Sequence, residues 1–158
     1  MRILGGDEVG KLKKFKFRLQ VVLDMRENEL EQRQMEMAKI VAALNAQKDK
    51  LQNIFLSQQK NTQDLEALYN SGDIDVVQIE NYRGYGIKLI SDAKNQERII
   101  RNTEMLLKRK QLEVLEAHKK VETLKKLKEK QEKEFHKEFL HSEMKELDDI
   151  TSARFKIG

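Results

Sequence analysis

A hydrophobic residue recurs at nearly every seventh position through the first half of the chain, and this period limits the fold more than any other feature. The ladder comprises Leu23, Leu30, Met37, Leu44, Leu51, Gln58 and Leu65. A second ladder, offset by three residues, divides evenly between apolar and polar side chains: Leu19, Arg26, Arg33, Ile40, Gln47, Ile54, Asn61 and Leu68. A period of 3.5 residues predicts a left-handed coiled coil, in which polar seam positions lower stability but fix the register.

The segment Asn70-Ser71-Gly72-Asp73 interrupts this period in a chain of 158 residues that has no proline. Gly72 can adopt the left-handed conformation that closes a helix. Asp75, or alternatively Asp73, can cap a second helix, and Gln78 completes an approximate capping box with Asp75. The period then resumes as Ile79, Gly86, Ala93, Ile100, Leu107, Val114 and Val121.

These signals predict an all-α fold in which two long helices form an antiparallel coiled-coil hairpin. We expect a single domain over residues 15–155, with helix 1 over 15–69, a turn over 70–75 and helix 2 over 75–153. Gly84 and Gly86 each cost roughly 1 kcal/mol in a helix interior, so a short or bent helix over 76–90 is an open alternative. With continuous helices, Phe15 should lie near Glu129 and roughly the last 20 residues should form a C-terminal helical overhang.

Composition supports a thin seam rather than a thick core, because charged residues make up 37% of the chain and aromatic residues 6%. Residues 1–14 contain three glycines without a helical period, and we expect a flexible basic tail there. Without cysteine there is no disulfide or thiolate nucleophile. No apolar run approaches the length of a membrane span, so the sequence predicts a soluble, cytosolic protein that does not cross a membrane.

The sequence offers no catalytic site, metal site or cofactor site. The closest two of the histidines His118, His136 and His141 are five residues apart, so they point to different sides of a helix. A two-helix hairpin also lacks a concave pocket in which carboxylates could be desolvated. Nucleic acid is not an expected partner, because the net charge is only +4 and many lysines alternate with glutamates. A generic coiled-coil scaffold or tether, and a basic hairpin that binds RNA or the ribosome, stay open as alternatives.

Three motifs, taken in order, resemble those of the FliJ family, soluble components of the bacterial flagellar type III export apparatus. The opening is Phe15-Lys16-Phe17-Arg18-Leu19-Gln20-Val21-Val22-Leu23-Asp24 with Arg26. Gly72-Asp73-Ile74 followed by Asn81-Tyr82 resembles the family's hairpin tip. The closing segment comprises Val121-Glu122-Thr123-Leu124-Lys125, then Glu143-Met144-Lys145-Glu146-Leu147-Asp148-Asp149 and Arg154.

The resemblance implies a non-enzymatic stalk similar to the central shaft of rotary ATP synthases. The implied partners are the hexameric flagellar export ATPase, the cytoplasmic region of the export-gate membrane protein and the export chaperones. The implied location is the cytoplasm, peripherally associated with the export apparatus at the inner membrane.

By the same analogy, the pole that carries both chain ends would bind the ATPase. Its candidate residues are Phe17, Arg18, Gln20, Met144, Lys145, Leu147, Asp148 and Arg154. The half near the turn would bind the gate through Tyr82, Tyr85 and Leu89. Phe17, Tyr82 and Leu89 also suit seam positions, whereas Tyr85 falls outside the seam. An apolar stripe on an unpaired overhang would itself indicate a partner.

Overall fold

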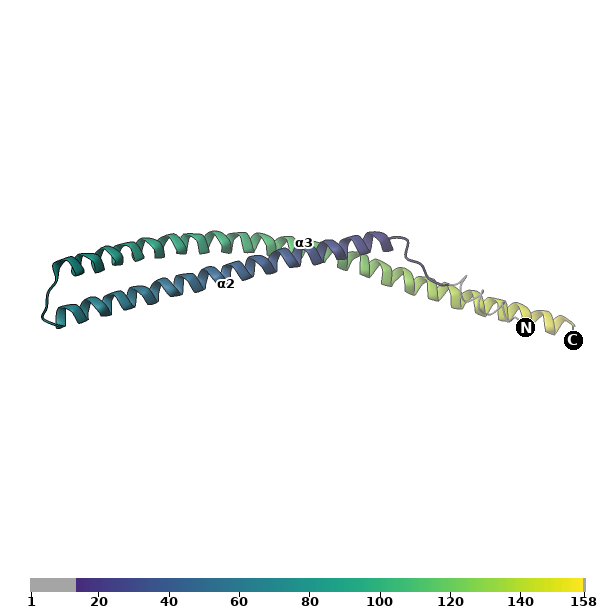
Figure 1. The fold of residues 1–158 in the computed structure, drawn as a ribbon. Coiled ribbons are helices and arrows are strands. Elements are labelled where there is room, and N and C mark those ends of the chain that lie inside the picture. Colours follow the sequence, from purple (N-terminus) through teal and green to yellow (C-terminus); the bar gives the residue numbers. More distant parts are fainter. Residues whose placement is uncertain (1–13, 158) are drawn as a thin grey trace, which may run out of the picture. The chain divides into compact units, whose positions relative to one another are not determined.

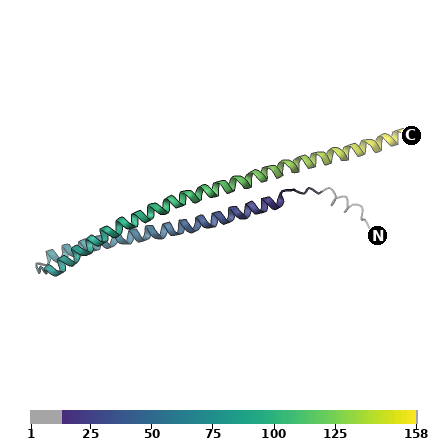
Figure 2. The ribbon, with the colours of Figure 1, turned by 90° about the horizontal axis from the view of Figure 1, so that it is seen from above.

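The computed structural model describes residues 14–157, and within that range it contains two helices and no strand. Helix α2 is Gln20–Asn70 and helix α3 is Val76–Ile157. The predicted all-α fold of two long helices packed against each other is confirmed (Figures 1 and 2). Residues 1–13, which carry most of the predicted tail, lie outside the described residues.

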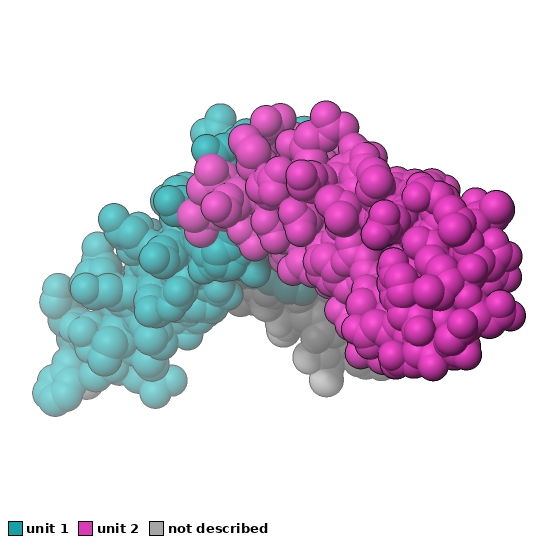
Figure 3. Space-filling view, turned by 90° about the vertical axis from the view of Figure 1, so that its left-hand side faces the viewer, with its two compact units in different colours: residues 1–31, 116–158 teal, residues 32–115 magenta. Residues whose placement is uncertain are grey.

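The described residues group into two compact units, coloured separately in Figure 3. Of the described residues, 14–31 and 116–157 form unit 1, and 32–115 form unit 2. Both helices contribute to both units. Every position of the two predicted ladders from Leu19 to Leu68 is buried or half-buried, which confirms the seam.

In unit 2 the segments of α2 and α3 run antiparallel and meet through small and polar side chains. The Asn61 amide donates a hydrogen bond to the Tyr82 carbonyl at 3.0 Å, and the Gln96 amide donates one to the Gln47 carbonyl at 3.0 Å. The buried apolar residues between and around these bonds are Leu44, Ile79, Leu89, Ala93 and Ile100. Since each amide bonds to the opposite helix, these two pairs fix the register of unit 2.

The turn in unit 2 has the predicted chemistry. Gly72 has φ +75°, the left-handed conformation that side chains disfavour. The Ser71 hydroxyl donates to the Leu68 carbonyl at 2.7 Å and satisfies one of the last carbonyls of α2. The Asp75 carboxylate accepts from the Val77 amide at 3.0 Å and from the Gln78 amide at 3.4 Å. Asp75 rather than Asp73 is therefore the cap of α3.

Helix α3 continues through Gly84 and Gly86, so the alternative of a separate short helix over 76–90 is wrong. Burial of Ile79 and Leu89 against α2 and the bond that Asn61 makes to the Tyr82 carbonyl hold this segment helical. Tertiary packing here outweighs the low helix propensity of the two glycines.

In unit 1 a small hydrophobic core joins the start of α2 to the middle of α3. Phe17, Leu23 and Val121 form its centre, with exposures of 7%, 3% and 1%. Half-buried apolar residues surround it, namely Phe15, Leu19, Leu30, Leu124 and Leu127.

The predicted start of helix 1 at residue 15 is wrong, since α2 begins at Gln20. The chain before it is not helical, and the Gln20 amide donates to the Phe17 carbonyl in a turn at 3.1 Å. A non-helical chain reaches up to about 3.3 Å per residue, compared with 1.5 Å in a helix. Phe15 therefore reaches further along α3 than Glu129, the neighbour expected from two continuous helices. Its ring centroid lies 5.7 Å from that of Phe135.

Candidate partner-binding surfaces

The three candidate residues at the start of α2 differ in their access to solvent. Phe17 is buried in the core of unit 1, and Arg18 is exposed. Gln20 is half-buried. Its side-chain nitrogen Nε2 donates to the Asp24 carboxylate at 2.8 Å, and its side-chain oxygen Oε1 accepts from the Lys128 ammonium at 2.8 Å. Arg18 is thus the residue of this group that a partner could contact directly, while Phe17 and Gln20 position the segment that carries it.

The five candidates at the C-terminal end of α3 are all exposed. Lys145, Asp148 and Arg154 are in the exposed class, and Met144 and Leu147 are 66% and 62% exposed. Leu140 and Phe155, which sequence reasoning left out, are 62% and 85% exposed.

Leu140, Met144, Leu147 and Phe155 fall within a sector of about 80° at 100° per residue, and we call them the C-terminal stripe. The helical spacing from Leu140 onward was the signal that could have found the two missing members.

Unit 1 does not bring the two groups of candidates together. Phe15 contacts Phe135 and Gln20 contacts Lys128, so the start of α2 lies beside the middle of α3. The C-terminal stripe begins further along the same helix, beyond these contacts.

The candidates in unit 2 occupy three different environments. Leu89 is 5% exposed and belongs to the seam, Tyr82 is half-buried, and Tyr85 is 46% exposed. Two shallow hollows share Tyr82 and Tyr85. One is completed by Gln78 and Asn81 of α3, and the other by residues of α2, namely Ser57, Lys60, Asn61 and Asp64. Tyr85 can therefore contact a partner, whereas Leu89 is buried in the seam between the helices.

Three aliphatic residues at the turn are also exposed, although sequence reasoning did not select them. Ile74, Val76 and Val77 are 62%, 66% and 69% exposed. Their position directly after Gly72, where no opposing helix can cover them, was the available signal.

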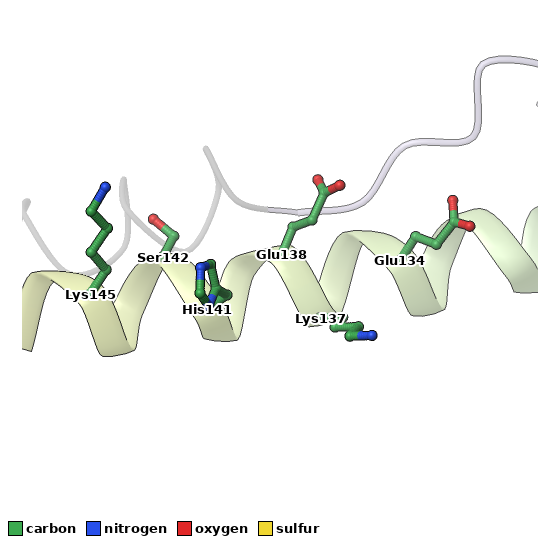
Figure 4. A pocket seen from close by; sticks show the side chains of 6 residues that line it. All are labelled: Glu134, Lys137, Glu138, His141, Ser142 and Lys145. Atoms are coloured by element: carbon green, nitrogen blue, oxygen red, sulfur yellow. The ribbon is translucent and has the colours of Figure 1, made fainter.

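A third hollow lies on α3 in unit 1. Its lining side chains are polar and exposed: Glu134, Lys137, Glu138, His141, Ser142 and Lys145. The carboxylates of Glu134 and Glu138 point to one side of the helix, while Lys137 points to the other (Figure 4).

A network of charged side chains crosses unit 2. Lys110 donates to Glu36 at 3.2 Å and to Glu113 at 3.2 Å, and Arg33 lies 3.3 Å from Glu113. The hydrogen bond from Lys110 is the main reason that the pKa of Glu36 is lowered. The pKa of Lys110 is raised, first by its hydrogen bond to Glu113 and then by that to Glu36. The network links α2 to α3 and has a structural role.

Over residues 14–157, no group of side chains is arranged to hold a metal ion. Neither helix in that range contains an apolar stretch of the length needed to cross a membrane.

Comparison with known proteins identifies one family. The family model described as flagellar FliJ protein matches residues 15–156. A relative from Bacillus subtilis (strain 168), named flagellar FliJ protein, is 27% identical over 143 residues, which cover 90% of this chain and 97% of the relative. No solved structure matches the chain.

Proposed function

Because the chain belongs to the flagellar FliJ family, we propose that it is a non-enzymatic component of the flagellar type III export apparatus and binds the hexameric export ATPase. The family match confirms the resemblance that the three motifs indicated. The same proposal includes the export gate and the export chaperones as further partners, with the protein held in the cytoplasm at the apparatus.

The C-terminal stripe is the observation that carries the ATPase-binding proposal. Its four apolar side chains are each more than 60% exposed on an amphipathic segment of α3. Exposed apolar side chains in such a row favour a partner that covers them. Lys145, Asp148 and Arg154 surround the row with both signs of charge and would orient the contact.

The export gate is proposed to bind unit 2 near Tyr85. An exposed tyrosine between two hollows offers an apolar ring and a hydroxyl, a combination that is common at protein interfaces. Ile74, Val76 and Val77 are further exposed apolar residues at the turn end of unit 2.

Capture of the purified export ATPase by the full chain tests the first contact. We expect the variant Met144→Ser/Leu147→Ser/Phe155→Ser to lose at least about tenfold in affinity, because three exposed apolar anchors are removed. The control Met35→Ser/Val41→Ser/Leu56→Ser removes exposed apolar side chains from α2 of unit 2 and should bind as the native chain does.

Deletion of residues 144–158 supplies a second variant. Residues 144–156 are exposed, so the rest of the chain should keep its melting temperature while ATPase capture is lost. Undiminished capture by both the triple variant and the deletion would overturn the assignment of the ATPase contact to the C-terminal stripe.

A further inference from the structure

Six cations occupy the outer face of α3 in unit 2. With about 100° of rotation per residue, they lie within about 60° of the line through Ile87 and Met105. All six are exposed, and we call them the basic face: Arg83, Lys94, Arg98, Arg101, Lys108 and Arg109. Among the described residues, none of the six forms an ion pair.

The carboxylates of the same stretch of α3 lie elsewhere on the helix. Glu104 lies 4.0 Å from Lys48 of α2, and Glu113 lies 3.3 Å from Arg33 of α2. Asp92 and Glu97 are half-buried. Glu104 and Glu113 pair with cations of α2, and the outer face from Arg83 to Arg109 carries positive charge without a paired carboxylate over about 40 Å.

Aliphatic side chains are interspersed with these cations. Ile87, Ile90, Met105 and Leu112 are 70%, 52%, 67% and 62% exposed on the same face. A surface that is both basic and apolar fits a partner that offers anionic groups above an apolar layer.

We propose that the basic face binds the surface of a membrane that contains anionic lipids, with α3 lying along the headgroups. Long cationic side chains can reach the phosphates while the aliphatic side chains enter the interface between headgroups and acyl chains. Nucleic acid would engage the cations but leave the four aliphatic residues in water. This inference does not depend on binding to the ATPase or to the gate.

Co-sedimentation of the full chain with lipid vesicles tests the proposal. We expect binding to vesicles of equal parts phosphatidylglycerol and phosphatidylcholine, and none to phosphatidylcholine alone. Each Lys or Arg near an anionic surface changes partitioning roughly fivefold. The variant Lys94→Gln/Arg98→Gln/Arg101→Gln should therefore bind about a hundredfold more weakly. The matched control Lys39→Gln/Lys50→Gln/Lys60→Gln removes the same charge from exposed positions of α2 and should bind like the native chain.

A second variant separates lipid from nucleic acid as the ligand. Ile87→Ser/Met105→Ser/Leu112→Ser should weaken vesicle binding about tenfold, because it removes apolar area from the interface. Helicity measured by circular dichroism should be unchanged in all variants, since every substituted residue is exposed. The proposal would be overturned if the α2 control lost as much vesicle affinity as the basic-face variant. It would also be overturned if the serine variant kept its vesicle affinity and the chain bound tightly to duplex RNA.

Discussion

Gly84 and Gly86 are separated by one residue in α3, and only Gly86 has a close neighbour on the opposite helix. A Cβ atom at Gly84 would meet no side chain and no backbone of the opposite helix within 4 Å. One built on Gly86 lies 3.2 Å from the amide nitrogen of Asn61. That nitrogen donates to the Tyr82 carbonyl, so the small residue at 86 makes room for a hydrogen bond between the helices.

The two glycines should therefore respond differently to alanine. Gly84→Ala should raise the free energy of unfolding by up to about 1 kcal/mol, which is the difference in helix propensity. Gly86→Ala should gain about 1 kcal/mol less, because displaced Asn61 loses part of its hydrogen bond. Urea unfolding of both variants measures the difference.

The Asn61→Ala background provides the control for this comparison. Without the Asn61 amide, a methyl group at residue 86 meets no polar neighbour, and the two alanine substitutions should become equivalent. A difference between them that persists in this background would show that Asn61 is not its cause.

At the scale of helices, the sequence period predicted the interior of the coiled coil and the turn. The period is compatible with burial of Asn61 and Gln96. Their bonds to carbonyls of the opposite helix depend on how the two helices are aligned, and the heptad pattern does not fix that alignment. A helix that starts at residue 15 would include Phe15 and Phe17, but both lie in a non-helical segment before α2. Exposed Lys16 and Arg18 oppose the helix dipole there, and the structure places both before α2.

The candidate surfaces were predicted less completely than the fold. Exposure of Met144 and Leu147 followed from the excess length of helix 2 and could be foreseen. A seam position for Phe17 could also be foreseen, but its packing against Val121 from a non-helical segment could not. The basic face was overlooked because counting charges along the chain does not separate inner from outer carboxylates.

The charged network of unit 2 predicts a dependence of stability on pH. The pKa of Glu36 is lower in the folded chain, so its contribution is fully present above the unfolded pKa of about 4.3 and is lost as pH falls through the folded pKa. Glu36→Gln should accordingly lower the melting temperature at pH 7, and this effect should shrink as the pH falls below about 4.3. The difference in melting temperature between the two proteins, measured across this range, checks the sign. A constant difference down to pH 3 would contradict it.

Considered as a whole, the chain contains two units with different interiors. Unit 1 centres on Phe17, Leu23 and Val121, whereas the seam of unit 2 includes buried Asn61 and Gln96. A single domain over residues 15–155 would unfold as one cooperative element, while two units with separate contacts would open separately. Hydrogen exchange along the chain distinguishes these two behaviours.

Val121→Ala should discriminate between them, because Val121 is 1% exposed and truncation of a buried aliphatic residue costs about 2 kcal/mol. If the units open separately, amides over 20–31 and 116–130 should exchange at least about tenfold faster, while those over 44–61 and 89–100 stay as in the native chain. Leu89→Ala, at a residue 5% exposed in unit 2, should give the reverse pattern. We expect the two opposite patterns, because no buried residue of the unit 1 core contributes to the seam of unit 2. Uniform acceleration in both variants would instead establish a single cooperative domain.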